Sequence, residues 1–133
     1  MIIVLDTSAA VEIVLQKKRA SAFAQHIADA DMVIAPDLYC SEMTNVFWKY
    51  YQFASLTMEQ CETALGKAML LPDEFVSSTE LYKEAFAMAC LTKSTAYDMF
   101  FLVLARRSNA FLMTIDLELK RKAKKHSVRV IEV

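Results

Sequence analysis

The chain opens with Ile2-Ile3-Val4-Leu5-Asp6-Thr7-Ser8, in which four consecutive apolar residues end at a carboxylate. A short, continuous apolar run of this kind is typical of a central parallel strand that helices cover on both faces. Ligands of open α/β sheets gather at the carboxyl ends of the strands, which is where Asp6 is expected. A carboxylate in such a buried position needs a hydrogen-bonding partner or a cation.

Further strand-like runs alternate with helical stretches along the chain. Strands are predicted at residues 2–5, 32–35, 75–77, 111–114 and 128–133, and helices at 10–15, 19–28, 38–52, 57–70, 79–91, 97–108 and 117–126. This alternation, joined by right-handed crossovers, predicts an α/β fold: a three-layer α/β/α sandwich around a mostly parallel five-stranded sheet. Because the chain has no repeat and no obvious linker, residues 1–133 are expected to form a single domain.

The composition limits the class of protein. The 133 residues are enough to bury a hydrophobic core, and a hydrophobic share of 56% argues against disorder. No apolar run reaches the roughly 18–20 residues that span a bilayer, and no secretory leader is visible, so a cytoplasmic protein without membrane attachment is expected. Three scattered cysteines, Cys40, Cys61 and Cys90, fit reduced thiols and do not suggest a zinc site.

Three further carboxylates lie at the ends or on the faces of predicted elements. Glu42 lies in the long helix after the second strand, Asp98 opens a strongly apolar helix, and Asp116 directly follows the fourth strand. Each has a simple alternative role: Glu42 as a solvated helix residue, Asp98 as a favourable charge at a helix N-terminus, and Asp116 as a helix cap. If the first and fourth strands are neighbours, Asp6 and Asp116 emerge at the same edge of the sheet.

A cluster of these carboxylates would need compensation of its charge. Two like charges 4 Å apart repel by roughly 4 kcal/mol at an effective dielectric constant near 20. Such a cluster must therefore bind divalent cations or hold protons. Oxygen ligands without histidine or cysteine favour Mg²⁺ or Mn²⁺ over zinc.

The carboxylates fall within four short motifs that resemble those of the PIN-domain family, and within it most closely the VapC-type toxins. In chain order the motifs are Asp6-Thr7-Ser8-Ala9; Pro36 with Ser41-Glu42 and Asn45; Tyr97-Asp98 with Leu104-Ala105; and Leu112-Met113-Thr114-Ile115-Asp116 with Leu119. Two features depart from the family pattern. Arg107-Ser108-Asn109-Ala110 replaces a loop that often holds glycine, and Met99 follows Asp98 where a small residue is common.

The resemblance implies a Mg²⁺- or Mn²⁺-dependent endoribonuclease that hydrolyses RNA phosphodiester bonds, with tRNA and rRNA as candidate substrates. It assigns metal binding and catalysis to Asp6, Glu42, Asp98 and Asp116. It assigns the orientation of these carboxylates by hydrogen bonds to Thr7, Ser8, Asn45 and Thr114. His26 and His126 fall outside the motifs, which favours metal-bound hydroxide over histidine-based chemistry.

The net charge of −1 hides an uneven distribution, because eight of the 15 basic residues lie from Arg106 onward. The last helix is therefore a candidate RNA-contacting element through Lys120, Arg121 and Lys124, although a solvated helix face is the simpler interpretation. The resemblance also implies a homodimer and a cognate antitoxin, the second half of a type II toxin–antitoxin pair. The aromatic-rich segment 38–53 and the following segment 57–70 would suit a groove for that antitoxin.

Three other functions fit parts of this sequence pattern. A PIN-like module could hold RNA or protein without cutting, although the complete set of four carboxylates argues against that alternative. A structure-specific DNA nuclease would use the same metal chemistry, and nothing in the sequence reads a 2′-hydroxyl group. A receiver-like signalling domain needs an aspartate after the third strand, but Ser78-Thr79 follows residues 75–77.

Overall fold

The computed structural model describes residues 1–133, and its core is a sheet of four strands. The strands are β1 (Ile2–Leu5), β2 (Met32–Pro36), β3 (Glu74–Val76) and β4 (Phe111–Met113). All neighbours pair in parallel, and the order β3-β2-β1-β4 puts β1 between β2 and β4. Val4 of β1 is level with Ile34 of β2 and with Leu112 of β4. The expectation that the first and fourth strands are neighbours is confirmed.

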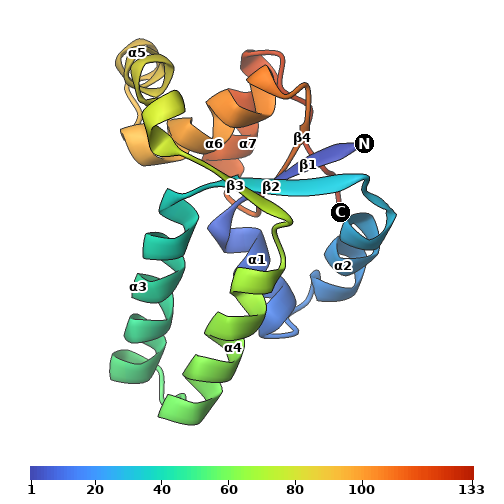
Figure 1. Cartoon of the computed structure of the whole chain (residues 1–133), viewed down its shortest axis with the longest axis vertical. Helices are drawn as coiled ribbons and strands as arrows, with labels where there is room; N and C mark the ends of the chain where they lie inside the picture. Colours follow the sequence, from blue (N-terminus) through green and yellow to red (C-terminus); the bar gives the residue numbers. More distant parts are fainter.

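Seven α-helices cover the two faces of the sheet. They are α1 (Thr7–Val14), α2 (Ala20–Asp29), α3 (Leu38–Phe53), α4 (Met58–Leu70), α5 (Tyr82–Thr92), α6 (Ala96–Arg107) and α7 (Leu117–Lys125). Figure 1 shows α1 to α4 on one side of the sheet and α5 to α7 on the other. The predicted α/β/α sandwich is confirmed. No helix alone is long and apolar enough to cross a bilayer, and α5 and α6 pass that test only as a pair with a bend of 115°.

The prediction of a fifth strand at residues 128–133 is wrong. This segment meets β4 at a single parallel bridge between Leu112 and Val130. Two backbone hydrogen bonds form the contact, from Leu112 N to the Arg129 carbonyl (2.8 Å) and from Ile131 N to the Leu112 carbonyl (2.9 Å). The segment lies at the sheet edge after a turn at Ser127, whose φ is 63°. The Arg129 guanidinium lies over the Phe111 ring of β4, with its carbon 4.2 Å from the ring centroid.

Two helices begin three residues away from the predicted position, for local reasons. The first helix starts at Thr7 and not at residue 10, because Asp6 has an extended backbone and its carbonyl accepts the Ala10 N–H at 3.1 Å. The predicted helix 79–91 is divided into a 3₁₀ turn at Ser78–Glu80 and α5. By contrast α4 begins where Thr57 predicts, because Thr57 and Gln60 form a capping box.

The hydrophobic core surrounds β1 and α6. Ile3, Val4 and Leu5 are fully buried, and α6 adds a buried run that includes Phe101 and Leu102. This helix packs against β1, β2 and β4. Truncating a large buried side chain of this kind costs about 3–5 kcal/mol. The packing therefore fixes the first turn of α6 beside the carboxyl ends of β1 and β4.

Candidate active site

A cleft of about 470 Å³ opens where β1 and β4 end, between α3, the first turn of α6 and the start of α7. All four predicted carboxylates line it: Asp6, Glu42, Asp98 and Asp116. Thr7, Ser8 and Asn45 line the same cleft, whereas Thr114 is fully buried against Asp6. Residues separated by more than 100 positions in the sequence are thus gathered at one sheet edge, as the strand pattern predicts for Asp6 and Asp116.

Asp6 is the most buried of the four cleft carboxylates, with 7% of its surface exposed. Its Oδ2 accepts hydrogen bonds from the Ser8 hydroxyl (2.7 Å) and the Thr114 hydroxyl (2.6 Å). The two hydroxyl oxygens are 3.0 Å apart. Burial raises the pKa of the Asp6 carboxyl, and these hydrogen bonds oppose the rise by stabilising the charged form. Ser8 and Thr114 therefore fix the orientation of Asp6.

Glu42 projects from α3 towards the same centre. Its Oε1 accepts a hydrogen bond at 3.0 Å from the hydroxyl of Thr7, the residue that directly follows Asp6 in the chain. Burial raises the pKa of Glu42 to about 7; the Thr7 bond opposes this, and the nearby charges of Asp6 and Asp98 add to it. Its alternative role as a freely solvated helix residue does not fit these surroundings. Asn45, one turn later, lines the cleft without a hydrogen bond to Glu42.

Asp98 and Asp116 complete the cluster from the starts of two helices. Burial raises the pKa of Asp98, the charges of Asp6 and Asp116 raise it further, and the charge of Lys122 lowers it. Asp116 is exposed and caps α7: its Oδ1 accepts the N–H groups of Glu118 (2.9 Å) and Leu119 (3.2 Å). Asp116 therefore caps α7, as its alternative role predicts. The same side chain also lines the cleft.

The donor set fits a hard divalent cation that keeps much of its water. Three of the four carboxylates have raised pKa values, and repulsion from at least one other carboxylate contributes to each. A divalent cation would relieve that repulsion. No group of three acidic, histidine or cysteine side chains is close enough to enclose an ion. Mg²⁺ is commonly held by only one or two carboxylates and several waters, so this arrangement suits it better than a closed protein cage.

Two lysines on the rim of the cleft were missed by the sequence analysis. Lys17 donates a hydrogen bond from Nζ to the Tyr50 hydroxyl at 2.8 Å, and Lys49 lines the cleft from α3. Lys49 could have been found, because it lies two helical turns after Glu42 and so shares its face. Lys17 could not, because it follows a turn at Gln16 whose φ is 52°.

The predicted RNA-contacting lysines and arginine on α7 do not line this cleft. Lys124 forms an ion pair with Glu132 near the end of the chain. Arg121 pairs with Glu118 at 2.8 Å and lines a separate pocket between the α5–α6 turn and α7. Lys120 is half-buried on the same helix. The basic side chains of α7 therefore point to more than one side of the helix.

Residues 3–125 match the profile of the PIN domain. The chain is 27% identical to ribonuclease VapC3 of Pyrobaculum aerophilum over 128 residues, which are 92% of this chain and 95% of that protein. Its fold is similar to the crystal structure of PAE2754 from Pyrobaculum aerophilum, with a TM-score of 0.76 and 20% identity over 96% of this chain and 87% of that one. It is also similar to VapBC2 from Rickettsia felis bound to a promoter DNA fragment, with a TM-score of 0.70 and 16% identity over 98% of both chains. With the four carboxylates gathered at the sheet edge, this match over most of the sequence shows that the chain belongs to the PIN-domain family.

Proposed function

We propose that the chain is a Mg²⁺- or Mn²⁺-dependent endoribonuclease that hydrolyses RNA phosphodiester bonds. The observation that carries this proposal is the convergence of four carboxylates in one cleft, three of them with raised pKa values. Acids whose pKa values are raised by burial and by neighbouring carboxylates cluster at functional sites. The similarity to a protein named as a ribonuclease supports RNA as the substrate.

The chain supplies orientation and electrostatics to this reaction. A divalent cation held among the cleft carboxylates Asp6, Glu42, Asp98 and Asp116 would supply a water of lowered pKa and would neutralise charge that grows on the phosphate. Ser8 and Thr114 hold Asp6 in one orientation towards the cleft, and Thr7 does the same for Glu42. Lys17 and Lys49 place positive charge on the rim, where the phosphates that flank the cut can lie.

The decisive experiment is cleavage of a pool of tRNA and rRNA by the purified protein, freed from any partner. It is run with Mg²⁺, with Mn²⁺ and with EDTA, beside Asp6→Asn, Asp98→Asn and the matched exposed control Lys83→Gln. We expect discrete fragments with either metal, none with EDTA, and none from the two aspartate variants. Intact RNA under every condition, or cutting that persists in EDTA, contradicts the proposal. DNA of the same sequence in a parallel assay tests the competing DNA nuclease.

We further propose that the protein is a cytoplasmic type II toxin held inactive by an antitoxin that docks on α3 and α4. An apolar groove of about 190 Å³ runs between these helices and is lined by Phe47, Trp48, Tyr51, Met58, Cys61 and Leu65, with Thr44 and Glu62. The Trp48 side chain is 51% exposed. Large exposed apolar surfaces are unusual on isolated proteins and mark interaction sites. The similarity to a VapBC assembly supports an antitoxin as the occupant.

Trp48 is the only tryptophan, so it reports directly on this groove. We expect the product of a neighbouring gene to shift Trp48 emission to shorter wavelength and to suppress RNA cleavage. Tyr51→Ser should weaken that complex at least tenfold, whereas the exposed Leu70→Ser on α4 should not. A complex that forms equally well with Tyr51→Ser places the antitoxin elsewhere.

A homodimer is proposed on the opposite side of the molecule, through α5. Tyr82 and Phe86 of this helix are each more than half exposed. A second copy of the chain would remove this apolar surface from water. Sedimentation of the purified protein should give a dimer, and Phe86→Glu should shift it to a monomer. A wild-type chain that stays monomeric at high concentration contradicts this assignment.

A further inference from the structure

A second concave site lies between the α5–α6 turn and α7, outside the carboxylate cleft. This pocket has a volume of about 300 Å³ and seven lining residues. Five of the seven are basic side chains: Lys93, Arg121, Lys122, Lys125 and His126. No carboxylate lines it, and Leu91 is its only hydrophobic residue. We call it the basic pocket.

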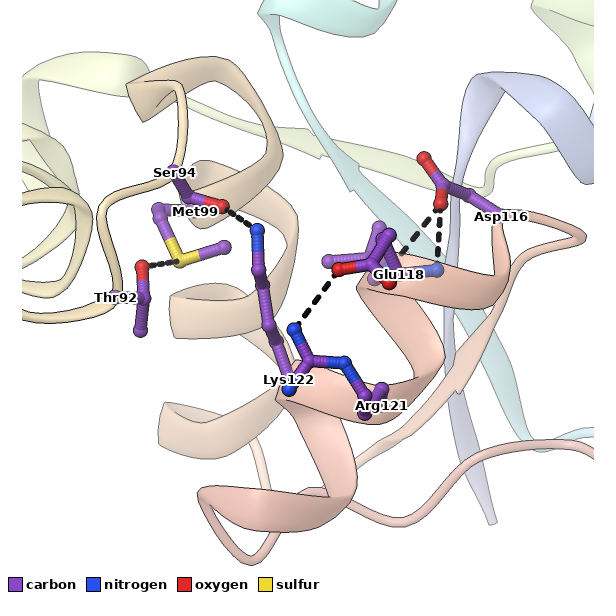
Figure 2. A network of polar contacts seen from close by, with 8 residues as sticks. Thr92, Ser94, Met99, Asp116, Glu118, Arg121 and Lys122 are labelled. Carbon is purple, nitrogen blue, oxygen red and sulfur yellow. Dashed lines mark hydrogen bonds and ion pairs between the residues drawn. The ribbon is translucent and has the colours of Figure 1, made fainter.

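The positive charge of the basic pocket is largely uncompensated. Arg121 alone pairs with a carboxylate, Glu118, and both side chains are more than half exposed. The Lys122 ammonium donates to the Ser94 hydroxyl, as Figure 2 shows. Lys93 and Lys125 form no ion pair in the structure. Positive charges gathered in a concave surface make the local electrostatic potential more positive. A bound anion would lower the repulsion between them.

The basic pocket adjoins the carboxylate cleft through α6 and α7. Ser94 lies four residues before Asp98, and the charge of Lys122 acts on Asp98. Figure 2 shows Asp116 at the start of the helix that carries Arg121 and Lys122. With a rise of about 1.5 Å per residue, Arg121 and Lys125 follow Asp116 by about 8 and 14 Å along the helix axis. A strand bound in the cleft can reach that far within a few nucleotides.

We propose that the basic pocket binds a backbone phosphate of the RNA strand that is cut in the carboxylate cleft, a few nucleotides from the cut. The inference rests on the proposed nuclease function and specifies where the substrate lies. A phosphodiester suits the pocket better than an acidic peptide. Protein interfaces have an apolar or aromatic centre, whereas this pocket offers almost only cationic donors. The pocket therefore positions the strand and does not read its sequence.

The test is binding of a fluorescent single-stranded RNA of 20 nucleotides, measured by anisotropy in EDTA so that no cleavage occurs. The pocket variant is Lys93→Gln/Lys125→Gln. The control, Lys67→Gln/Lys83→Gln, makes the same change in net charge at two exposed lysines elsewhere on α4 and α5. Thermal unfolding establishes that both variants are folded. Titrations at several salt concentrations give the slope of log K against log salt.

We expect the pocket variant to bind RNA about tenfold more weakly than the control. Its salt slope should fall by about 0.7, because one lost phosphate contact removes about 0.7 for single strands. A pocket variant with the affinity and slope of the control overturns the proposal. So does a variant that loses binding to an oligoglutamate peptide of equal charge while its RNA affinity is unchanged, because the pocket then docks a protein.

A cleavage assay with Mn²⁺ separates this inference from the nuclease proposal. If the wild-type protein cuts RNA and the pocket variant binds and cuts like the control, the inference about the pocket alone is overturned. If the wild-type protein cuts nothing under any condition while the pocket variant binds RNA more weakly than the control and with a lower salt slope, phosphate binding at the basic pocket is supported and the nuclease proposal fails.

Discussion

The carboxylate cleft and the basic pocket share α6 and α7 but are built in opposite ways. In the cleft, Asp6 is buried and held by two short hydroxyl hydrogen bonds, and burial raises the pKa values of Asp6, Glu42 and Asp98. In the pocket, Lys93 and Lys125 are exposed and form no ion pair. The geometry of the cleft depends on buried hydrogen bonds, whereas the attraction of the pocket for an anion depends on its net positive charge. Substitutions in the cleft should therefore change chemistry and stability, and those in the pocket should change affinity and salt dependence.

The largest effect on RNA cleavage is expected for Asp116→Asn. This substitution keeps the helix cap of α7 but removes the negative charge of Asp116 from the cleft. Asparagine caps a helix about as well as aspartate, so the free energy of unfolding should stay within about 0.5 kcal/mol of the wild type. The negative charge in the cleft is lost, and RNA cleavage with Mn²⁺ should fall at least about 100-fold, which corresponds to about 2.7 kcal/mol. Single-turnover cleavage and urea unfolding measure the two effects.

Asp116→Ala serves as the companion variant, since it removes the cap together with the charge. It should lose about 1 kcal/mol of stability in addition to the activity. If Asp116→Asn cuts RNA at the wild-type rate, Asp116 serves α7 alone and the metal site consists of the other three carboxylates.

Metal binding should stabilise the protein through the cleft and not through the pocket. At free Mn²⁺ of about 30 times its dissociation constant, the free energy of unfolding should rise by about 2 kcal/mol. Asp98→Asn should lose most of this gain, and Lys93→Gln/Lys125→Gln should keep it. Thermal unfolding with and without Mn²⁺ measures the shift. A wild-type protein indifferent to millimolar Mn²⁺ would count against a metal site in the cleft.

The sequence predicted most of the framework because the framework is set by local patterns. The continuous apolar run before Asp6 marks a central strand, and the Thr57 cap marks the start of α4. The fifth strand could not be judged from its apolar residues, because pairing at the sheet edge depends on tertiary contacts, and this segment meets β4 only at the Leu112–Val130 bridge. The division of the predicted helix 79–91 likewise depends on the Ser77 side chain, which accepts the Thr79 N–H.

The site was predictable to the extent that it follows from strand ends and motifs. Asp6, Glu42, Asp98 and Asp116 line one cleft, but their roles in binding metal and in catalysis stay predictions. The basic pocket was not foreseen. It combines the α5–α6 turn with one side of α7, so Lys93 and Lys125 are brought together by packing across 32 residues of chain. No period or spacing in the sequence marks such a contact.

A third prediction compares one hydroxyl in each region. Thr114 is fully buried, donates to Asp6 at 2.6 Å and accepts the Asp116 N–H at 3.1 Å. Thr114→Val keeps the shape but leaves a buried carboxylate one donor short, which should cost about 1.5 kcal/mol of stability. Ser94→Ala removes the partner of Lys122 at the pocket, where solvent can replace it, and should cost less than about 0.5 kcal/mol. Urea unfolding measures the loss of stability in each variant. Equal losses would contradict the inference that buried hydrogen bonds stabilise the cleft more than exposed ones stabilise the pocket.

The smallest expected effect is a gain in stability, caused by the substitution Glu42→Gln in the cleft. The folded protein raises the pKa of Glu42 from 4.5 to about 7, chiefly through burial. The charged form is therefore disfavoured on folding, so the resulting loss of stability is absent below pH 4.5, grows as the pH rises, and is complete above pH 7. Glu42→Gln keeps an acceptor for Thr7 and removes the charge. In EDTA at pH 8 it should stabilise the protein by about 1 kcal/mol, a value well below the full shift because Glu42 is partly solvated.

At pH 4.5 the same substitution should be close to neutral, because the wild-type carboxyl is then protonated in the folded state and about half protonated in the unfolded state. Lys125→Gln in the basic pocket should change stability by less than about 0.5 kcal/mol at either pH, since its ammonium is exposed. Urea unfolding at the two pH values distinguishes these cases. A gain for Glu42→Gln that is equal at pH 4.5 and pH 8 would reflect packing, and a loss at pH 8 would mean that the carboxylate is stabilised where it lies. Only a gain confined to high pH shows that the fold holds this charge at a cost, as a site prepared for a cation must.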